Sequence, residues 1–483
     1  MKRYYIFLWL IVIFSSCENA LDEQPKSFIS KTNYYKDEAD AEGAILGAYS
    51  IMSPDYYEIT YYLMEVLHAD YLNGRGSQAT ISNFDHVLDA TNIARASTNW
   101  SKLYIGINRA NAVLNNVPKI EKITEATRTR ILAEAHYLRG AAYFNLVRNW
   151  GAVPIKTEES VDLSSVASPR EPVEKVYELI ISDAIAAEKD LPESVGAETG
   201  KASKWAAKML LAQVYLTLEQ WSLAAEKSNN IITSGKYSLV NVSQPDDFYK
   251  LFAVETSSED IMSVHHSATM GSGLPGYIHR SNTYPYNYGS GVYAWLPDTN
   301  SFIGSSWDNK DLRKDFNLYR TYKNDKGETV SLPPSTPVLF KKFITNSAGL
   351  TLYSVPIYRY AETLLMYAEA ACMAEDGPSA LALERLNMVK RRAYGYNPNF
   401  ISPVDYPSGL SRDAFRDIVL KERGYEFIIE RQRWWDLKRT GRVKDAFAAV
   451  GKTFIDERYL WPIPQNEINN NPALTPKDQN PGY

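Results

Sequence analysis

Cysteine is scarce in this chain: Cys17 and Cys372 are the two that occur among 483 residues. If Cys17 serves another purpose, no intramolecular disulfide is possible, and the fold must be held by packing alone. Basic charge is not in excess, because 52 Lys and Arg residues face 57 Asp and Glu residues, a formal net charge of −5. A mildly acidic chain without a basic run is not expected to bind nucleic acid.

Long apolar runs are also missing, except for a short one at the N-terminus. Residues 4–14 are apolar and follow two basic residues, which is the layout of an export signal, and the run is shorter than the roughly 20 residues of a bilayer span. The run Phe14-Ser15-Ser16-Cys17 resembles a bacterial lipobox. We therefore predict that residues 1–16 are a lipoprotein signal peptide and that Cys17 is lipidated. The alternative is an ordinary cleaved signal with an incidental cysteine.

Helical periodicity, by contrast, is abundant. Apolar residues recur at three- and four-residue steps. This spacing predicts helices from about residue 37 to Pro54 and over residues 92–117, 124–149, 173–191, 202–219, 221–234, 357–375, 379–393, 411–431 and 433–440. Cys372 falls among Leu and Ala on one side of its helix, so we predict that this thiol packs in the core and is not reactive.

The predicted helices form pairs, and the layout of one pair is repeated along the chain. Residues 209–232 and 363–389 share one layout of two apolar helices and a short break, and residues 133–147 look like the first half of a third unit. Stacked pairs bury a continuous core, as in tetratricopeptide repeats. We predict a mainly α fold in which tetratricopeptide-like helical pairs form the scaffold and carry a loop-rich, partly irregular insertion. Generic helical hairpins are the alternative.

The insertion is the least regular part of the chain. Its stretch 271–297 contains five Gly, three Pro and five Tyr, which excludes a long helix. A loop region of this length is usually functional or mobile. We predict one domain over residues 17–483. Its parts are the helical scaffold at 37–234 and 357–445, the loop-rich ligand region at 235–356 and an extended segment at 446–483.

Two stretches near the C-terminus are expected to lock the end of the chain onto the helical body. Residues 422–442 read as an amphipathic helix whose charges can pair at three- and four-residue spacing. These charged residues are Glu422, Arg423, Glu426, Glu430, Arg431 and Arg433. Residues 459–483 are rich in proline, so this stretch is predicted to be extended along the surface or in a groove.

Together these stretches match motifs of a known family. The first contains the run R-x-x-D-L-x-R-x-G, formed by Arg433, Asp436, Leu437, Arg439 and Gly441. The second contains Pro462, Ile463, Pro464, Glu467, Asn471, Pro472, Leu474 and the final residues 479–483. Residues 133–154 and 358–370 match two further helices. The chain resembles the RagB/SusD family of nutrient-binding outer-membrane lipoproteins of Bacteroidetes.

The resemblance implies a function. It implies a protein anchored through Cys17 on the outer membrane at the cell surface, which captures a glycan and delivers it to a SusC-like TonB-dependent transporter barrel. Some members bind peptides, and that alternative stays open. The resemblance implies no enzymatic activity and no cofactor.

A sugar site needs an aromatic platform and planar polar groups for the hydroxyls. Two loop stretches offer them, and the resemblance places ligand contacts in the same two regions. Residues 68–84 are expected to supply the polar groups, and residues 271–310 the platform, with Trp295 as the first choice. The candidate ligand-binding residues are Asp70, Tyr71, Asn73 and Arg75 in the first stretch and Tyr284, Tyr286, Tyr288, Tyr293, Trp295 and Trp307 in the second. The alternative for each ring is a loop anchor packed inward.

Other conspicuous residues are not assigned to a site. Trp100 opens a helical pattern and is predicted to lie in the core. His265 and His266 would point to opposite faces of a strand, so they do not form a metal pair. Asp308 and Asp311 could bind calcium, but a helix start rich in acids fits them better. No metal site is predicted.

Two other functional classes stay open. An α-rich glycoside hydrolase would need two carboxylates at a fixed separation, and no motif proposes such a pair among the 57 acids. A tetratricopeptide-type scaffold that binds only proteins would not require so many tyrosines in residues 271–297.

Overall fold

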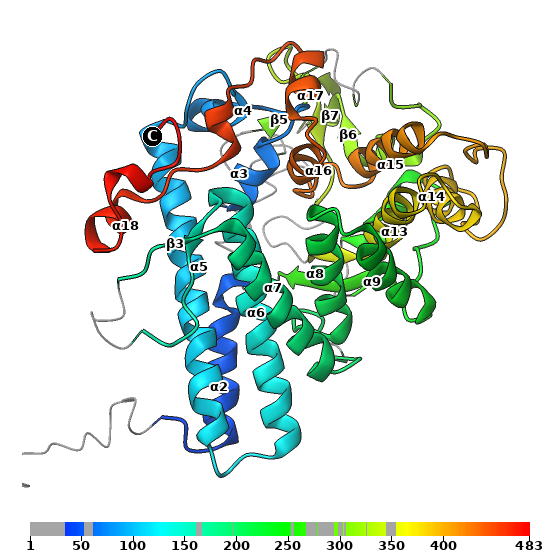
Figure 1. Ribbon diagram of the computed structural model, residues 1–483. Coiled ribbons are helices and arrows are strands. Elements are labelled where there is room, and N and C mark those ends of the chain that lie inside the picture. The colour runs from blue at the N-terminus through cyan, green and yellow to red at the C-terminus, as the bar shows by residue number, and fades with distance from the viewer. Residues whose placement is uncertain are drawn as a thin grey trace, which may run out of the picture.

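The structure of the chain is a computed structural model. It describes residues 34–52, 61–160, 167–196, 198–252, 256–266, 278, 294–297, 303, 306–324, 326–343 and 354–483. In this part the chain is mainly helical and its strands are short (Figure 1), which confirms the predicted mainly α fold. None of the described helices combines the length and the apolar character that a bilayer crossing requires.

The helices follow the predicted pattern closely. In chain order they are α2 (Glu38–Ala48), α3 (Tyr61–Leu67), α4 (Ala79–Ser82), α5 (Ala90–Asn116), α6 (Glu125–Trp150), α7 (Val173–Asp190), α8 (Lys204–Thr217), α9 (Trp221–Thr233), α12 (Leu312–Asn317), α13 (Tyr360–Ala374), α14 (Ala380–Ala393), α15 (Arg412–Glu426), α16 (Arg433–Arg439), α17 (Val443–Ala449) and α18 (Gln465–Asn470). Short helical turns include η1 (Tyr49–Met52) and η3 (Gly76–Gln78). Several helices begin at a side-chain cap, because Thr124, Ser203, Ser379 and Ser411 each accept a hydrogen bond from the N–H three residues further on.

The strands of the described residues form two-stranded antiparallel sheets. They pair β1 (Asn73–Gly74) with β5 (Ala294–Trp295), β2 (Val153–Pro154) with β3 (Arg170–Glu171), β4 (Asp260–His265) with β10 (Ser354–Arg359), β6 (Leu318–Tyr319) with β9 (Leu339–Phe340), and β7 (Thr321–Lys323) with β8 (Thr329–Ser331). Each sheet joins segments that are separated in the chain by turns, loops or helices, so the sheets fasten loops rather than build a layer of their own.

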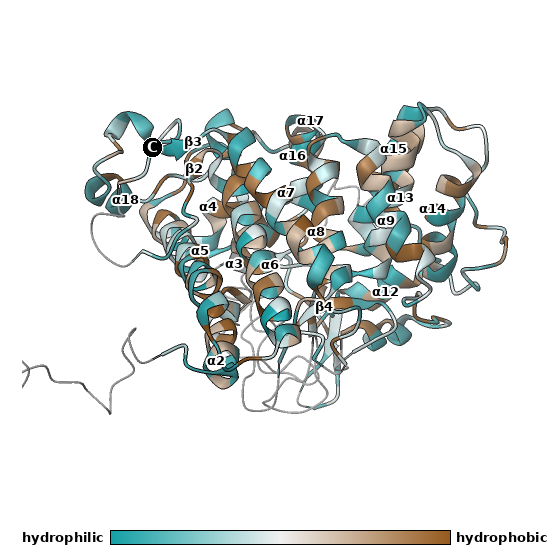
Figure 2. Cartoon of the chain, turned by 60° about the horizontal axis from the view of Figure 1, so that its bottom comes forward, coloured by the Kyte–Doolittle hydropathy of each residue, from teal (hydrophilic) through white to brown (hydrophobic). Residues whose placement is uncertain are grey.

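The helices stack in a curved row that follows chain order. Helix α5 packs on α6, α6 on α7, α7 on α8, α8 on α9, α9 on α13, and α13 on α14 and α15. Figure 2 shows the row from α5 at one end to α14 and α15 at the other. The two hairpins with the shared layout, α8–α9 and α13–α14, meet through α9 and α13, as stacked pairs should.

Small residues allow close approach between neighbouring helices. A Cβ added at Gly140 on α6 would lie 3.3 Å from the Cβ of Asp183 on α7. At Gly106 on α5 it would lie 1.8 Å from a methyl carbon of Ile51. The predicted core residues are also confirmed: Trp100 is 3% exposed and Cys372 is fully buried. Burial raises the pKa of the Cys372 thiol to about 11, which keeps it protonated and unreactive at neutral pH.

Two predicted helix boundaries are wrong. Helix α13 begins at Tyr360 rather than at residue 357, because residues 354–359 form β10 and pair with β4. Helix α15 ends at Glu426 rather than at residue 431. The chain then turns through Ile429 and Arg431, whose φ angles are 54° and 65°, in the left-handed region that ends a helix.

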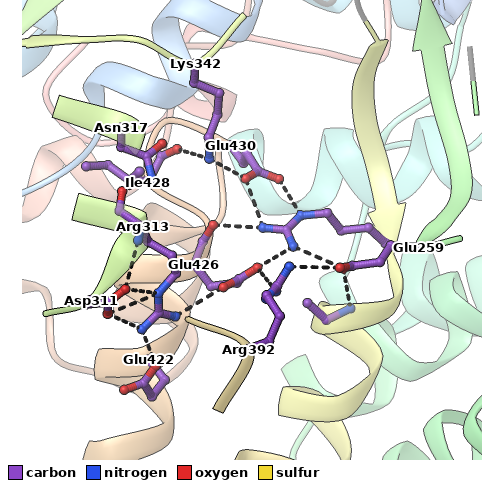
Figure 3. A network of polar contacts seen from close by, with 12 residues as sticks. Glu259, Asp311, Arg313, Asn317, Lys342, Arg392, Glu422, Glu426, Ile428 and Glu430 are labelled. Carbon is purple, nitrogen blue, oxygen red and sulfur yellow. Dashed lines mark hydrogen bonds and ion pairs between the residues drawn. The ribbon is translucent and has the colours of Figure 1, made fainter. Parts of the chain in front are cut away.

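The carboxylates of α15 and of the turn that follows it belong to a buried network of ion pairs (Figure 3). Glu426 accepts hydrogen bonds from Arg359 on β10, at 2.6 Å, and from Arg392 on α14, at 2.5 Å. Arg313 on α12 contacts Glu422 and Glu426, and Lys342 contacts Glu430. The sequence predicted pairing along one helix. That prediction is wrong, because these side chains are buried and their partners lie on other elements, so the network ties α12 and β10 to α14 and α15.

The C-terminal segment docks against the end of α6 and α5, as Figure 1 shows for α18 and the chain end. The N–H of Trp461 donates to the carbonyl oxygen of Asn149 at 2.7 Å, and the side chain of Asn480 donates to the carbonyl oxygens of Trp150 and Trp461. The predicted structural lock is thus confirmed. The segment is not wholly extended, because the proline-free stretch after Pro464 forms α18.

Candidate ligand site

The two loop stretches predicted to share a ligand site meet in space. Strand β1 pairs antiparallel with β5, and Asn73 lies directly opposite Trp295. On the other side of β5, the N–H of Leu296 donates to the carbonyl oxygen of Val338 at 3.1 Å. Strand β5 is therefore held from both sides, and it lies at the upper end of the molecule as drawn in Figure 1.

A pocket of about 370 Å³ opens where β1 and β5 meet. Its walls come from β1, α4, β5 and the segment after α17. The residues that line it are Asp70, Asn73, Gly74, Ala79, Ser82, Asn83, Trp295, Pro297, Val450 and Lys452. Asp70, Asn73 and Trp295 belong to the predicted ligand-binding set, so the structure brings one aromatic and two polar candidates to one pocket.

Trp295 supplies the aromatic wall. Its side chain is partly exposed, and it also packs against a small buried cluster of Tyr319, Leu332 and Leu339. The ring is thus held by the protein while it lines the pocket. A ring fixed in this way is a suitable platform for the apolar face of a ligand, because little conformational freedom is left to lose on binding.

The loop of β1 is built around Gly74 and Ser82. The Ser82 hydroxyl accepts a hydrogen bond from the Gly74 N–H at 2.8 Å and donates to the carbonyl oxygen of Ala79. A Cβ added at Gly74 would lie 2.4 Å from the carbonyl oxygen of Gln78, a distance that the backbone cannot accommodate. Glycine at this position therefore allows the turn that presents Asn73 to the pocket.

Arg458, in the C-terminal segment, holds residues 80–86 of the same loop through hydrogen bonds. Its guanidinium donates hydrogen bonds to the carbonyl oxygens of Thr80, Ile81, Asn83 and His86, at 2.8 to 3.1 Å. Arg458 is 1% exposed. Burial lowers the pKa of Arg458 to about 10, so this side chain still carries its charge at neutral pH. The C-terminal segment thus positions one wall of the pocket.

Asp70 lies at the pocket with its charge already neutralised. Both of its carboxylate oxygens accept hydrogen bonds from Arg433, at 2.9 and 2.7 Å, in a bidentate pair. The residue is 3% exposed. Asp70 therefore contributes shape and a fixed dipole rather than a net negative charge.

Lys452 reaches the pocket from the end of α17 and was not predicted. Gly451, with φ of 73°, ends the helix in a Schellman motif: the N–H of Lys452 donates to the carbonyl oxygen of Phe447, and that of Gly451 to Ala448. The Lys452 ammonium donates to the carbonyl oxygen of Leu72 at 2.5 Å. Gly followed by Lys indicates a helix end in the sequence, but nothing local indicates that this end packs beside residue 72.

Comparisons with known proteins agree with this architecture. Residues 21–216 match a family described as starch-binding and associating with the outer membrane, and residues 301–453 and 442–483 match the SusD family. The chain belongs to the RagB/SusD family. Over its full length it is similar to SusD-like protein P2 of Formosa agariphila, at 27% identity with 100% of each chain covered.

Solved structures share the RagB/SusD fold. A SusD homologue from Bacteroides thetaiotaomicron superposes with a TM-score of 0.80 at 24% identity, covering 94% of this chain and 99% of the other. Surface glycan-binding protein A from the same organism, solved in complex with laminarihexaose, gives 0.74 at 21% identity and covers 93% and 100%. At these identities the likeness establishes the fold.

The RagB/SusD motif in residues 433–441 is structural in this chain. Asp436 accepts hydrogen bonds from Arg423 and Arg439, each at 2.8 Å, while Arg439 also forms a bidentate pair with Glu369. Arg433 holds Asp70 at the pocket. The motif thus fixes α16 to α13, α15 and the β1 loop, as the structural interpretation of the sequence predicted.

Not every predicted ligand residue lies at the pocket. Tyr71 is buried, and its hydroxyl accepts a hydrogen bond from the Ile429 N–H. Trp307 is also buried and stacks on Tyr425, with 4.7 Å between ring centroids and 11° between planes. Both rings pack inward, which was the alternative stated for each. Arg75 is exposed on the turn after β1 and does not line the pocket. Tyr284, Tyr286, Tyr288, Tyr293 and Cys17 lie outside the described residues.

A second hollow adjoins the first. It has a volume of about 390 Å³, lies between α15, α16 and α17, and shares Asp70 and Val450 with the pocket at β1.

No group of three or more His, Cys, Asp or Glu side chains within the described ranges is arranged to hold a metal ion. Asp311 caps α12, which confirms the helix-start interpretation for this acid, and Asp308 accepts hydrogen bonds from the Lys310 N–H and Tyr394 in the turn before it.

Proposed function

We propose that this protein is a non-enzymatic glycan-binding lipoprotein of the outer membrane surface, and that the pocket between β1 and β5 is its binding site. The observation that carries the proposal is the pairing of Asn73 with Trp295 on one pocket wall. A fixed indole face beside an amide matches the apolar faces and hydroxyl rims of sugars. Membership of the RagB/SusD family and the laminarihexaose complex of a structural relative support the same chemistry.

Binding rather than hydrolysis is the activity proposed. In the described part of the pocket, Asp70 is the one carboxylate, and Arg433 occupies both of its oxygens. A glycosidase needs a second carboxylate across the cleft. An assay for released reducing sugar on each polysaccharide that binds separates the two activities, because product formation would contradict a pure binding protein.

Affinity electrophoresis in polysaccharide gels tests the proposal directly. The purified chain should be retarded by at least one polysaccharide, and Trp295→Ala should lose most of that retardation. Trp221→Ala is a matched control, because Trp221 is also partly exposed but lies at the start of α9, away from the pocket. Equal loss in both variants, or no loss in Trp295→Ala, would move the site elsewhere. Peptides presented to the same variants test the alternative ligand class.

Delivery to a SusC-like TonB-dependent transporter and anchoring through Cys17 are parts of the same proposal. A single domain over residues 17–483 would then sit on the cell surface, with the lipid on its first residue. Cells labelled with a radioactive fatty acid should incorporate the label into the wild type and not into Cys17→Ser. Co-purification of the transporter with the wild type tests the partnership.

A further inference from the structure

The pocket at β1 and β5 has an unbalanced charge. Of the described residues that line it, Asp70 and Lys452 are the ionisable ones. Arg433 neutralises Asp70 through two hydrogen bonds, so the Asp70–Arg433 pair carries no net charge. The ammonium of Lys452 therefore gives the described lining of the pocket a net positive charge.

Lys452 has hydrogen-bonding capacity to spare. An ammonium has three N–H donors, and within the described part of the chain the carbonyl oxygen of Leu72 is the one acceptor of its hydrogen bonds. The aromatic ring of Phe447 lies 5.8 Å from the ammonium and adds a weak attraction. A partly buried cation whose one hydrogen-bond acceptor in the described part of the chain is neutral is poorly compensated for the water that it has lost, although the Asp70 carboxylate also attracts it.

The position of this cation is fixed by the backbone. The Schellman motif at Gly451 sets the direction in which the chain leaves α17, and the hydrogen bond to Leu72 holds the other end of the side chain. The charge is therefore built into the pocket rather than carried on a mobile surface side chain. Fixed charge of this kind is suited to selecting a ligand, because little reorganisation is needed on binding.

We infer that the glycan bound at this pocket carries an anionic substituent, a carboxylate or a sulfate ester, and that Lys452 binds this group while Trp295 stacks on the ring. The inference rests on the proposed function and names the class of glycan. A charge-assisted hydrogen bond from an ammonium to an anion is about twice as strong as a bond between neutral groups, so an acidic sugar gains more here than a neutral one.

Affinity electrophoresis with defined probes tests the inference. The probes are polygalacturonate and alginate for carboxylates, carrageenan and dextran sulfate for sulfates, and laminarin and galactan as neutral polymers, all at physiological salt. At least one anionic polymer should retard the protein more than the neutral ones do. The polymer that does so distinguishes the carboxylate from the sulfate.

Three variants assign the effect to Lys452. Lys452→Met should weaken binding of the anionic polymer by about tenfold to a hundredfold, the usual range for a hydrogen bond to a charged group. Lys452→Arg should keep much of the binding. Lys444→Met makes the same change in net charge at an exposed lysine on α17 that pairs with Asp456, and it should bind as the wild type does. Thermal melts should show all three folded.

The outcomes separate this inference from the proposed function. Strong binding of a neutral polymer, lost in Trp295→Ala and unchanged in Lys452→Met, would overturn the inference and leave the glycan site in place. Equal weakening by Lys452→Met and Lys444→Met would mean diffuse surface attraction and would also overturn it. No retardation by any of the six polymers would count against the proposed function, and the inference would fall with it.

Discussion

The indole nitrogen of Trp150, at the end of α6, donates a hydrogen bond to the carbonyl oxygen of Pro462 at 2.9 Å. The ring of Trp461 meets Trp150 edge to face, with 5.0 Å between centroids and 85° between planes. Both rings are almost completely buried. Residues separated by most of the chain thus share one core, and the C-terminal segment is part of the fold that supports the ligand pocket.

Deletion of residues 459–483 should therefore destabilise the whole protein. It would uncover Trp150 and remove the buried indole of Trp461 together with the hydrogen bonds of Asn480. A milder version is Trp461→Ala, which should lower the free energy of unfolding by about 3–5 kcal/mol, as is usual for a buried aromatic ring. Chemical denaturation measures the change. The exposed Phe400→Ala is the control and should change stability little, whereas equal stability of wild type and Trp461→Ala would contradict the proposed lock.

Trp295→Ala should affect both binding and stability. Loss of stacking should weaken glycan binding by about 1–3 kcal/mol. Stability should also fall modestly, because the ring packs on Tyr319, Leu332 and Leu339. This differs from the expectation for a freely exposed ring. Leu339→Ala removes packing in the same cluster without touching the pocket, so its melting temperature should fall while calorimetric titration shows nearly normal affinity. A strong loss of affinity in Leu339→Ala would make the effect of Trp295 indirect.

Acid should weaken the fold through Glu369. Burial alone would raise the pKa of Glu369, but Arg439 and Arg416 outweigh it and lower the pKa to about 2, against 4.5 for the free side chain. Since the folded pKa lies below the unfolded one, the stabilisation is present above about pH 4.5 and is lost as the pH falls toward 2. It is on the order of 3 kcal/mol at neutral pH.

The test compares Glu369→Gln with the wild type at several pH values. Their difference in free energy of unfolding should be large at pH 6 and should shrink steadily below pH 4.5. The control is Glu375→Gln, just after the end of the same helix, where the side chain is exposed and the difference should be small at every pH. A difference for Glu369→Gln that stays constant with pH would contradict the assigned ion pairs.

Binding of an anionic glycan should fall in mildly alkaline solution. Burial lowers the pKa of Lys452 to about 8, and the Asp70 carboxylate, paired with Arg433, opposes the shift. Affinity should be constant below pH 7 and fall between pH 7 and 9, because the ammonium that binds the anion loses its proton. Lys452→Arg should bind independently of pH over this range, because its guanidinium stays charged.

Stability provides an independent check on Lys452, because its pH dependence has the opposite sign. The folded pKa lies below that of the unfolded chain, 10.5, so between pH 8 and 10.5 the unfolded state holds the proton that the folded state has lost. The contribution of Lys452 to the free energy of unfolding should therefore increase as the pH rises through that window. A contribution of Lys452 to the melting temperature that falls, rather than rises, as the pH increases from 8 to 10.5 would contradict this assignment.

The sequence by itself determined most of the scaffold. Apolar spacing predicted the helices of the row, because this signal acts within a few residues. The repeated layout of residues 209–232 and 363–389 predicted helix pairs that stack, and the motif around Arg433 and Asp436 indicated the family. The sequence also indicated two loops whose aromatic and polar residues suit sugar binding, and Asn73 and Trp295 from those loops line one pocket.

Tertiary structure alone decided how these parts meet. The charges of residues 422–433 looked like partners along one helix. Instead, Glu422, Glu426 and Glu430 are buried and pair with cations on other elements such as Arg313 and Arg359, and the partly exposed Arg433 pairs with Asp70. Tyr71 and Trp307 are of the residue types that line ligand sites, but both are buried. Lys452 has no local signal in the sequence, and it lies at the pocket through its contact with Leu72. The physical reason is range: helix periodicity depends on neighbours three or four residues apart, while burial and pocket lining depend on contacts across hundreds of residues that no local pattern encodes.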